Sequence, residues 1–119
     1  MIVGACVVEL HIEGSQSLKA KRGVVRSIMR RVRNRFELAV SEVGGQDTWQ
    51  YAAIGLAAVG SDATRVRAVL ERAGDFIEEL ALAQVLRTDI EVLDLPHHEQ
   101  PWDPDDQENL LGIDIEEER

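Results

Sequence analysis

Cysteine and aromatic residues are scarce in this sequence. Cys6 is the single cysteine among 119 residues, which excludes an intrachain disulfide and any Cys-x-x-Cys zinc or redox motif. Phe, Trp and Tyr together make up 4% of the chain, so a core must be built mostly from Val, Leu, Ile and Ala. Cys6 lies inside an apolar run, and we expect it to be buried as a small hydrophobic side chain.

Motifs that would indicate catalysis or metal binding are also absent. The sequence has no Gly-x-x-x-x-Gly-Lys-Ser/Thr phosphate loop, no Gly-x-Ser-x-Gly nucleophile turn and no carboxylate pair tied to a nucleophile. His97 and His98 are adjacent and far from His11, so no His-x-x-x-His metal spacing occurs, and a solvated linker is the expected setting for the pair. We therefore expect no enzyme, no cofactor and no metal site.

The first residues are typical of neither a signal peptide nor a membrane span. They contain no basic segment, and an acidic residue, Glu9, follows the first eight residues. The length accommodates one small domain with a core of its own. We expect a cytoplasmic protein.

Charge is distributed unevenly along the chain, whose net charge is -9. Residues 96–119 hold nine acidic residues against one Arg, whereas residues 1–95 hold thirteen acidic and twelve basic residues. We therefore predict a domain over residues 1–96 and an acidic, mobile tail over residues 97–119. Trp102 and the apolar residues between Leu110 and Ile115 are expected points at which this tail attaches to the folded domain.

The spacing of apolar residues predicts four strands and two helices in the order βαββαβ. Apolar residues at period two predict strands over residues 2–12, 37–43, 51–59 and 85–95. A period of 3.6 predicts a helix over residues 18–36, capped by Ser15 or Ser17, and a second helix that follows its cap, Ser61 or Asp62, and extends to residue 80.

This order predicts a ferredoxin-like α+β fold. The first and third strands are the apolar ones and suit the centre of the sheet, while the second and fourth carry charges suited to edges, so the expected order is 4-1-3-2 in an antiparallel sheet. Both helices then cover one face. The other face is too apolar to leave in water, and we expect a homodimer or, failing that, the tail to cover it. Its apolar residues are Val3, Ala5, Val7, Ala53, Ala57 and Val59.

The first predicted helix carries most of the basic charge. Eight of the thirteen Lys and Arg residues lie between Lys19 and Arg35, with no acidic residue among them. Rotation by 100° per residue places five of them in a strip about 21 Å long, with Arg31 and Arg35 on the other flank. Two lysines occupy the first turn, where the helix dipole disfavours cations. The predicted anion or nucleic-acid contacts are Lys19, Lys21, Arg22, Arg26, Arg30 and Arg33.

A second group of candidates lies around the turn before the third strand. Trp49 and Tyr51 suit either the stacking of a base or, as aromatics more often do, the closure of one end of the sheet or a subunit contact. Glu42 is a further candidate partner or interface residue. Because Tyr51 is the single aromatic on the two central strands, we expect RNA to be contacted through phosphates and not read base by base.

Three segments together resemble a known family. They are Ser17-Leu18-Lys19-Ala20-Lys21-Arg22, then Arg31-Val32-Arg33-Asn34-Arg35-Phe36, then Glu42 with Gln46-Asp47-Thr48-Trp49-Gln50. The resemblance is to the YlxP-like family of small bacterial proteins of unknown function, over about residues 1–95. It implies a ferredoxin-like fold and a cytoplasmic protein whose relatives are often encoded beside translation and ribosome-maturation factors. It implies no catalytic residue, and the acidic tail departs from the family's usual length.

Two functions follow as expectations. The first is a non-catalytic protein that binds RNA or a ribosomal particle through phosphates on the basic helix, with the tail competing for that helix. The second is a homodimeric protein-interaction module that uses the sheet face and the Trp49 loop and has no nucleic-acid role. Against the first stands the simpler interpretation that the basic helix is a solvated face, neutralised by acidic groups elsewhere in the fold or by the tail.

Overall fold

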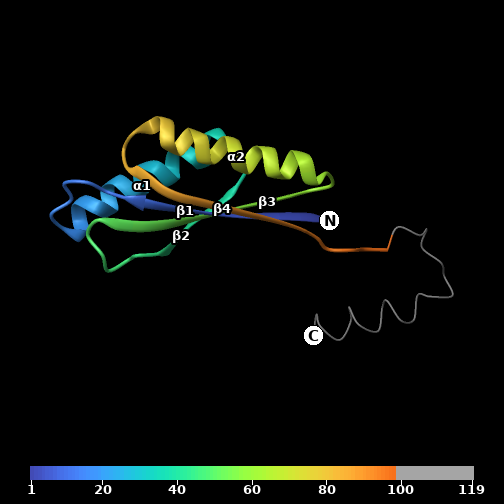
Figure 1. Ribbon diagram of the computed structural model, residues 1–119, viewed down its shortest axis with the longest axis horizontal. Helices are drawn as coiled ribbons and strands as arrows, with labels where there is room; N and C mark the ends of the chain where they lie inside the picture. Colours follow the sequence, from blue (N-terminus) through green and yellow to red (C-terminus); the bar gives the residue numbers. More distant parts are fainter. Residues whose placement is uncertain (99–119) are drawn as a thin grey trace, which may run out of the picture.

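A computed structural model describes residues 1–98 (Figure 1). The predicted tail therefore lies outside the described residues, apart from His97 and His98. The two helices lie on the same side of a four-stranded sheet, as Figure 1 shows. The elements are β1 Ile2–His11, α1 Leu18–Arg35, β2 Ala39–Gly44, β3 Tyr51–Gly60, α2 Ala63–Leu80 and β4 Gln84–Asp94.

The sheet confirms the predicted topology. Its strand order is β2-β3-β1-β4, which is the expected 4-1-3-2 order, and each neighbouring pair is antiparallel. At its centre Cys6 pairs with Leu56 on one side and with Ile90 on the other. The apolar strands are central and the strands with charges are at the edges, as the composition of each strand predicted. The fold is α+β and ferredoxin-like.

Both helix starts are set by a polar cap. Ser17 Oγ accepts a hydrogen bond from Ala20 N at 3.0 Å, and Asp62 Oδ1 accepts from Thr64 N at 2.9 Å. Ser15, the other candidate cap of α1, is buried in the preceding loop and donates to Ser17 O instead. These caps satisfy amide groups that have no partner within the helix, which stabilises each helix by about 1 kcal/mol.

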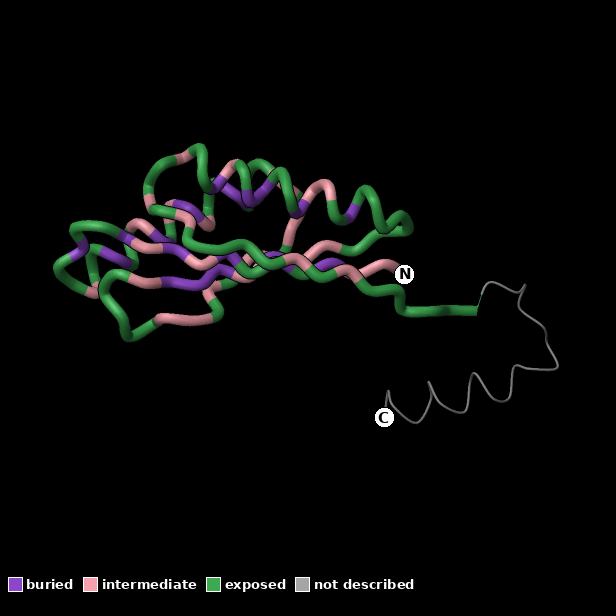
Figure 2. Tube along the Cα trace, in the orientation of Figure 1, coloured by how far each residue is buried: buried purple, intermediate pink, exposed green. Residues whose placement is uncertain are grey.

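The core lies between the sheet and the two helices, where Figure 2 shows buried segments facing each other. Every second residue of β1 points into it, and Val8 and Leu10 are completely buried. Full burial of one such aliphatic side chain contributes about 1.5–3 kcal/mol. Cys6 is 1% exposed, as predicted, and burial raises the pKa of its thiol to about 11.

Helix α2 approaches the sheet closely at Gly4. A methyl group on this residue would lie 2.5 Å from Val66 Cγ1 and 2.7 Å from Leu70 Cδ1. A glycine in β1 therefore allows α2 to pack directly on the backbone of the strand.

No helix of residues 1–98 lies on the opposite face of the sheet, which exposes large apolar side chains. Val59 is 69% exposed, Val43 54% and Val7 40%. Within residues 1–98, neither helix is both long and apolar enough to cross a membrane.

Candidate nucleic-acid interface

One side of α1 presents a row of exposed cations. None of them forms an ion pair with a carboxylate of residues 1–98, although acidic residues are numerous there. Arg33 is held in place, because its Nη2 donates to the carbonyl of Val40 in β2 at 2.8 Å. This bond places the row on the flank of α1 that faces the β2 edge. We call this row the basic strip, and its members are Lys19, Arg22, Arg26, Arg30 and Arg33.

The two remaining arginines of α1 lie on its other flank. Arg31 Nε donates to Ser27 Oγ at 3.2 Å, and the guanidinium of Arg35 lies 5.2 Å from the centre of the Phe76 ring of α2. That ring also packs edge-on against Phe36, with ring centres 5.6 Å apart. Arg35 thus contributes to the contact between the two helices, and the basic strip is confined to the outer flank.

Lys21 does not belong to the interface, and its prediction as a phosphate contact is wrong. Its side chain is 0% exposed. The ammonium group donates to the carbonyl of Gly45 and to the carbonyl of Tyr51, the latter at 3.1 Å, and lies 3.7 Å from Glu42 Oε2. A buried charge must be paired and hydrogen-bonded to be tolerated, and these three oxygens meet that requirement.

Glu42 is consequently a structural residue more than an exposed interface residue. Its side chain is 22% exposed, and within residues 1–98 its buried Oε2 has no hydrogen-bond partner, so its main stabilising contact is the charge of Lys21. In β2 it points toward the helices, beside Ile54 of β3. Its charge was one reason to place this strand at an edge, which is correct, but the side chain itself points toward the core.

Lys21 connects α1 to the turn between β2 and β3. Gly45 begins this turn with a φ of 78°, which a residue with a side chain rarely adopts, and its carbonyl also accepts from Thr48 N at 3.0 Å. The turn is held from the other side as well, because Gln50 Nε2 donates to Ser15 O at 3.3 Å and Ile12 N donates to Gln50 O at 2.9 Å. The start of α1 and this turn thus form one rigid corner.

The predicted aromatic candidates at this corner differ in their surroundings. Trp49 is 53% exposed on the turn. Tyr51 is half-buried, and its hydroxyl donates to Glu9 Oε1 at 2.6 Å. This hydrogen bond to a carboxylate raises the pKa of Tyr51. Tyr51 therefore fixes the sheet end, whereas Trp49 offers an open aromatic surface.

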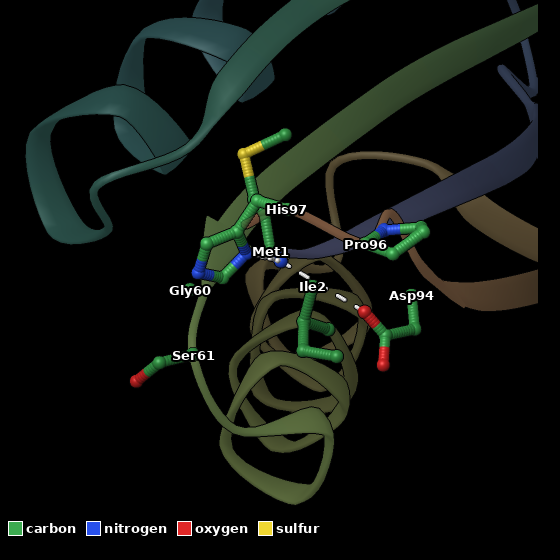
Figure 3. A pocket seen from close by; sticks show the side chains of 7 residues that line it. All are labelled: Met1, Ile2, Gly60, Ser61, Asp94, Pro96 and His97. Atoms are coloured by element: carbon green, nitrogen blue, oxygen red, sulfur yellow. Dashed lines mark hydrogen bonds and ion pairs between the residues drawn. The ribbon is translucent and has the colours of Figure 1, made fainter. Parts of the chain in front are cut away.

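A pocket of about 360 Å³ lies elsewhere, beside the first residue and the end of β4 (Figure 3). The Met1 ammonium donates to Leu95 O at 2.8 Å and lies 3.8 Å from Asp94 Oδ1 and 3.3 Å from His97 Nδ1. These contacts join β1 to the segment after β4. Residues 1–98 contain no group of three or more His, Cys, Asp or Glu side chains placed to hold a metal ion.

Known proteins resemble this chain over most of its length. Residues 3–90 match the model of the family described as Protein of unknown function (DUF503). The uncharacterized protein YlxP of Bacillus subtilis (strain 168) is 40% identical over 77 residues, which cover 65% of this chain and 84% of that relative.

A solved structure also superposes on the chain. It is that of a point mutant of SnoaB, a cofactor-independent oxygenase from Streptomyces nogalater, with a TM-score of 0.45 and 10% identity over 83% of this chain and 98% of that one. At this TM-score the likeness says nothing about the chemistry of the present chain.

The family match includes both helices and the corner that Lys21, Glu42 and the turn build together. The resemblance to YlxP-like proteins is thereby confirmed, and the chain belongs to the DUF503 family of proteins of unknown function.

Proposed function

We propose that this protein binds structured RNA, alone or within a ribosomal particle, through phosphate contacts made by the basic strip, and that it catalyses no reaction. The observation that carries the proposal is the strip itself: five exposed cations on one helix, with no carboxylate of residues 1–98 paired to any of them. Neutralisation of the strip by acidic groups within residues 1–98 would require such pairs, and these residues show none. Neutralisation by the acidic tail concerns residues outside the described part of the chain.

The geometry of the strip suits a phosphate backbone. Its cations recur every three or four residues, which is about 4.5–6 Å along a helix axis. The helix is rigid, because the hydrogen bonds of Lys21 fix its start and the bond from Arg33 to Val40 fixes its end to β2. The backbone that carries these cations loses little conformational freedom when RNA binds, so the entropy lost on binding comes mainly from the side chains.

The expected signature is a steep dependence on salt. Neutralising one phosphate changes the slope of log K against log salt by about -0.7 to -0.9, so five contacts give a slope of about -3.5 to -4.5. Affinity should then fall roughly 100- to 500-fold between about 50 and 200 mM salt. Little preference among sequences is expected, because side chains that contact phosphates carry no base information.

Fluorescence anisotropy with a labelled RNA hairpin tests this. The full chain should bind with a micromolar Kd at low salt, and replacing Arg22, Arg26 and Arg30 by Ala should abolish most of the binding. The matched control replaces three exposed arginines of α2, Arg65, Arg67 and Arg72, which removes the same charge from the other helix. Equal losses in both variants would mean that net charge alone matters, and the proposal would fail.

A ribosomal particle is the proposed physiological form of this RNA. Sedimentation of a native bacterial lysate through a sucrose gradient, followed by detection of the protein in each fraction, tests this part separately. The wild-type protein should travel with ribosomal particles, and the triple variant of the basic strip should remain at the top. Hairpin binding without such co-sedimentation would retain the RNA proposal and exclude the ribosomal one.

A second candidate function is a protein-interaction module, and the exposed apolar face of the sheet favours it. Val7, Val43 and Val59 are large side chains on a face that no helix covers, and contiguous apolar surface of this kind marks interaction sites. This candidate predicts no RNA binding at any salt concentration. The same anisotropy measurement therefore separates the two candidates.

A further inference from the structure

The helix-free face of the sheet contains a hollow made by small residues. Along β1 and β3 the residues that point to this face include Ala5, Gly55 and Ala57, and a methyl group on Gly55 would lie 2.8 Å from Val43 Cγ1. The hollow has a volume of about 360 Å³. Its lining on this face consists of Ala5, Val7, Ala39, Ser41, Val43, Gly55 and Ala57, which are apolar apart from Ser41.

Charged groups of the same face lie toward its edge. On β4, Arg87 Nε is 2.8 Å from Asp89 Oδ2, and the pairing register places Asp89 beside Val7 and Glu91 beside Ala5. The face therefore has an apolar part over β2, β3 and the first residues of β1, with charged groups along β4 and at Glu9, toward the end of β1. An apolar centre with a polar rim is the anatomy of a protein interface.

We propose that a second copy of this chain covers the helix-free face, so that two sheets pack face to face in a homodimer. The area is sufficient. The strands have 10, 6, 10 and 11 residues, and at about 3.3 Å per residue with strands about 4.8 Å apart they make a face of roughly 590 Å². Two such faces bury about 1,200 Å², which is the lower end of the range of stable protein interfaces.

A second copy fits the hollow better than the C-terminal residues of the same chain do. Residues 99–119 contain nine acidic residues and one Arg. The border of the face already carries Asp89 and Glu91, so this acidic sequence would meet like charges there. A two-fold pairing centred on the hollow places apolar residues of both copies against each other and leaves the charges of β4 at the rim.

The dimer leaves the basic strip open. The helices lie on the side of the sheet opposite to the proposed interface (Figure 1), so the two strips face outward from opposite sides of a four-layer α/β/β/α particle. Self-association and RNA binding are then separate properties. Failure of one in an experiment does not imply failure of the other.

The oligomeric state of the full chain tests the proposal. Sedimentation equilibrium or light scattering at tens of micromolar should give twice the 13.3 kDa of one chain. Ala57→Arg places a charge in the hollow and should give a monomer. Thr64→Arg adds the same charge at an exposed position of α2 and should remain a dimer. Circular dichroism checks that each variant is folded.

A second variant keeps the proposal testable if Ala57→Arg does not fold. Val43→Lys changes a side chain that is 54% exposed at the edge strand, so the monomer fold is unaffected while the interface is disrupted. Monomeric Val43→Lys beside a dimeric wild type supports the proposal. A wild-type chain that is monomeric at these concentrations overturns it, whatever covers the face, and so does a dimer that both Ala57→Arg and Val43→Lys leave intact.

Discussion

The two helices have the same length and cover the same face of the same sheet, yet they carry charge differently. Each has 18 residues, and each buries one stripe of aliphatic side chains. α2 carries three arginines and four acidic residues, whereas α1 carries eight basic residues and no acidic one. The comparison shows what the fold needs from a covering helix: an apolar stripe and a cap, but not a basic surface.

The basic surface of α1 also opposes helix stability. Arg22, Arg26 and Arg30 follow one another at intervals of four residues, and like charges at this spacing destabilise a helix by about 0.2–0.5 kcal/mol per pair. Lys19 stands in the first turn, where the dipole disfavours a cation. An anionic partner is the reason that we propose for this arrangement, and the following predictions test the difference between the helices.

The largest expected effect is on the free energy of unfolding, and it distinguishes Lys21 from Lys19, the two lysines of α1. Lys21→Ala should lower the free energy of unfolding by about 3 kcal/mol, because it leaves the carboxylate of Glu42 half-enclosed without its cation. Lys19→Ala should change it by less than about 0.5 kcal/mol, as expected for an exposed residue. Urea denaturation measures both. Removing both charges in Lys21→Met with Glu42→Leu should recover most of the loss, and equal effects of the two single alanine variants would contradict the buried role of Lys21.

The next effect concerns the caps. Asp62→Ala should destabilise the protein by about 1 kcal/mol, since Asp62 Oδ1 accepts from two amides of α2 and also places a negative charge at the helix start. Ser17→Ala should lower the free energy of unfolding by less, because Ser17 caps α1 with a single hydrogen bond, accepted from Ala20 N, and has no charge. Thermal unfolding of the two variants compares them. A greater loss for Ser17→Ala would show that cap charge is unimportant here.

A smaller effect should change stability and RNA binding in opposite directions. Lys19→Glu places an acidic residue in the first turn of α1 and should stabilise the protein by about 0.3–1 kcal/mol. The same change removes one cation of the basic strip and should weaken RNA binding. Urea denaturation and RNA anisotropy on one sample measure both properties. A variant that is more stable and binds RNA equally well would remove Lys19 from the interface.

The smallest effect is the contribution of one arginine to the salt dependence. Arg26→Ala should reduce the magnitude of the slope of log K against log salt by about 0.7–0.9, the value for one phosphate contact. Arg67→Ala on α2 should leave the slope unchanged. Anisotropy titrations at four salt concentrations give the slopes. Identical slopes for the two variants would contradict the proposal that α1, and not α2, contacts phosphates.

The fold could be predicted from the sequence because local patterns and global topology agree. Period-two runs in β1 and β3 and the 3.6-residue period of both helices gave the element order, and the charges of β2 and β4 gave the edges. The predicted first and last residues of the helices and strands were less exact. The second strand begins at Ala39, two residues later than predicted, and Phe36 closes α1 as its C-cap in place of extending it.

The structure agrees with the predicted exposure of the five cations of the basic strip and contradicts it for Lys21. The helical rotation places Lys21 near 300°, between Ile28 near 280° and Val32 near 320°, so the pattern itself indicated burial. The rarity of buried lysine argued the other way. The oxygens that make its burial possible come from Gly45 and Tyr51, which are 24 and 30 residues distant, and local periodicity contains no information about such partners.

The enclosure of Lys21 has a practical consequence for labelling. The chain contains two lysines, Lys19 and Lys21, and Lys19 is the exposed one. An amine-reactive dye should therefore attach to one lysine side chain, that of Lys19 at the beginning of the basic strip, and to the terminal amine, whose ordinary pKa is lower than that of lysine. Once the terminal amine has been blocked near neutral pH, where it is the more reactive amine, labelling at alkaline pH gives an optical probe at Lys19 without any engineered cysteine.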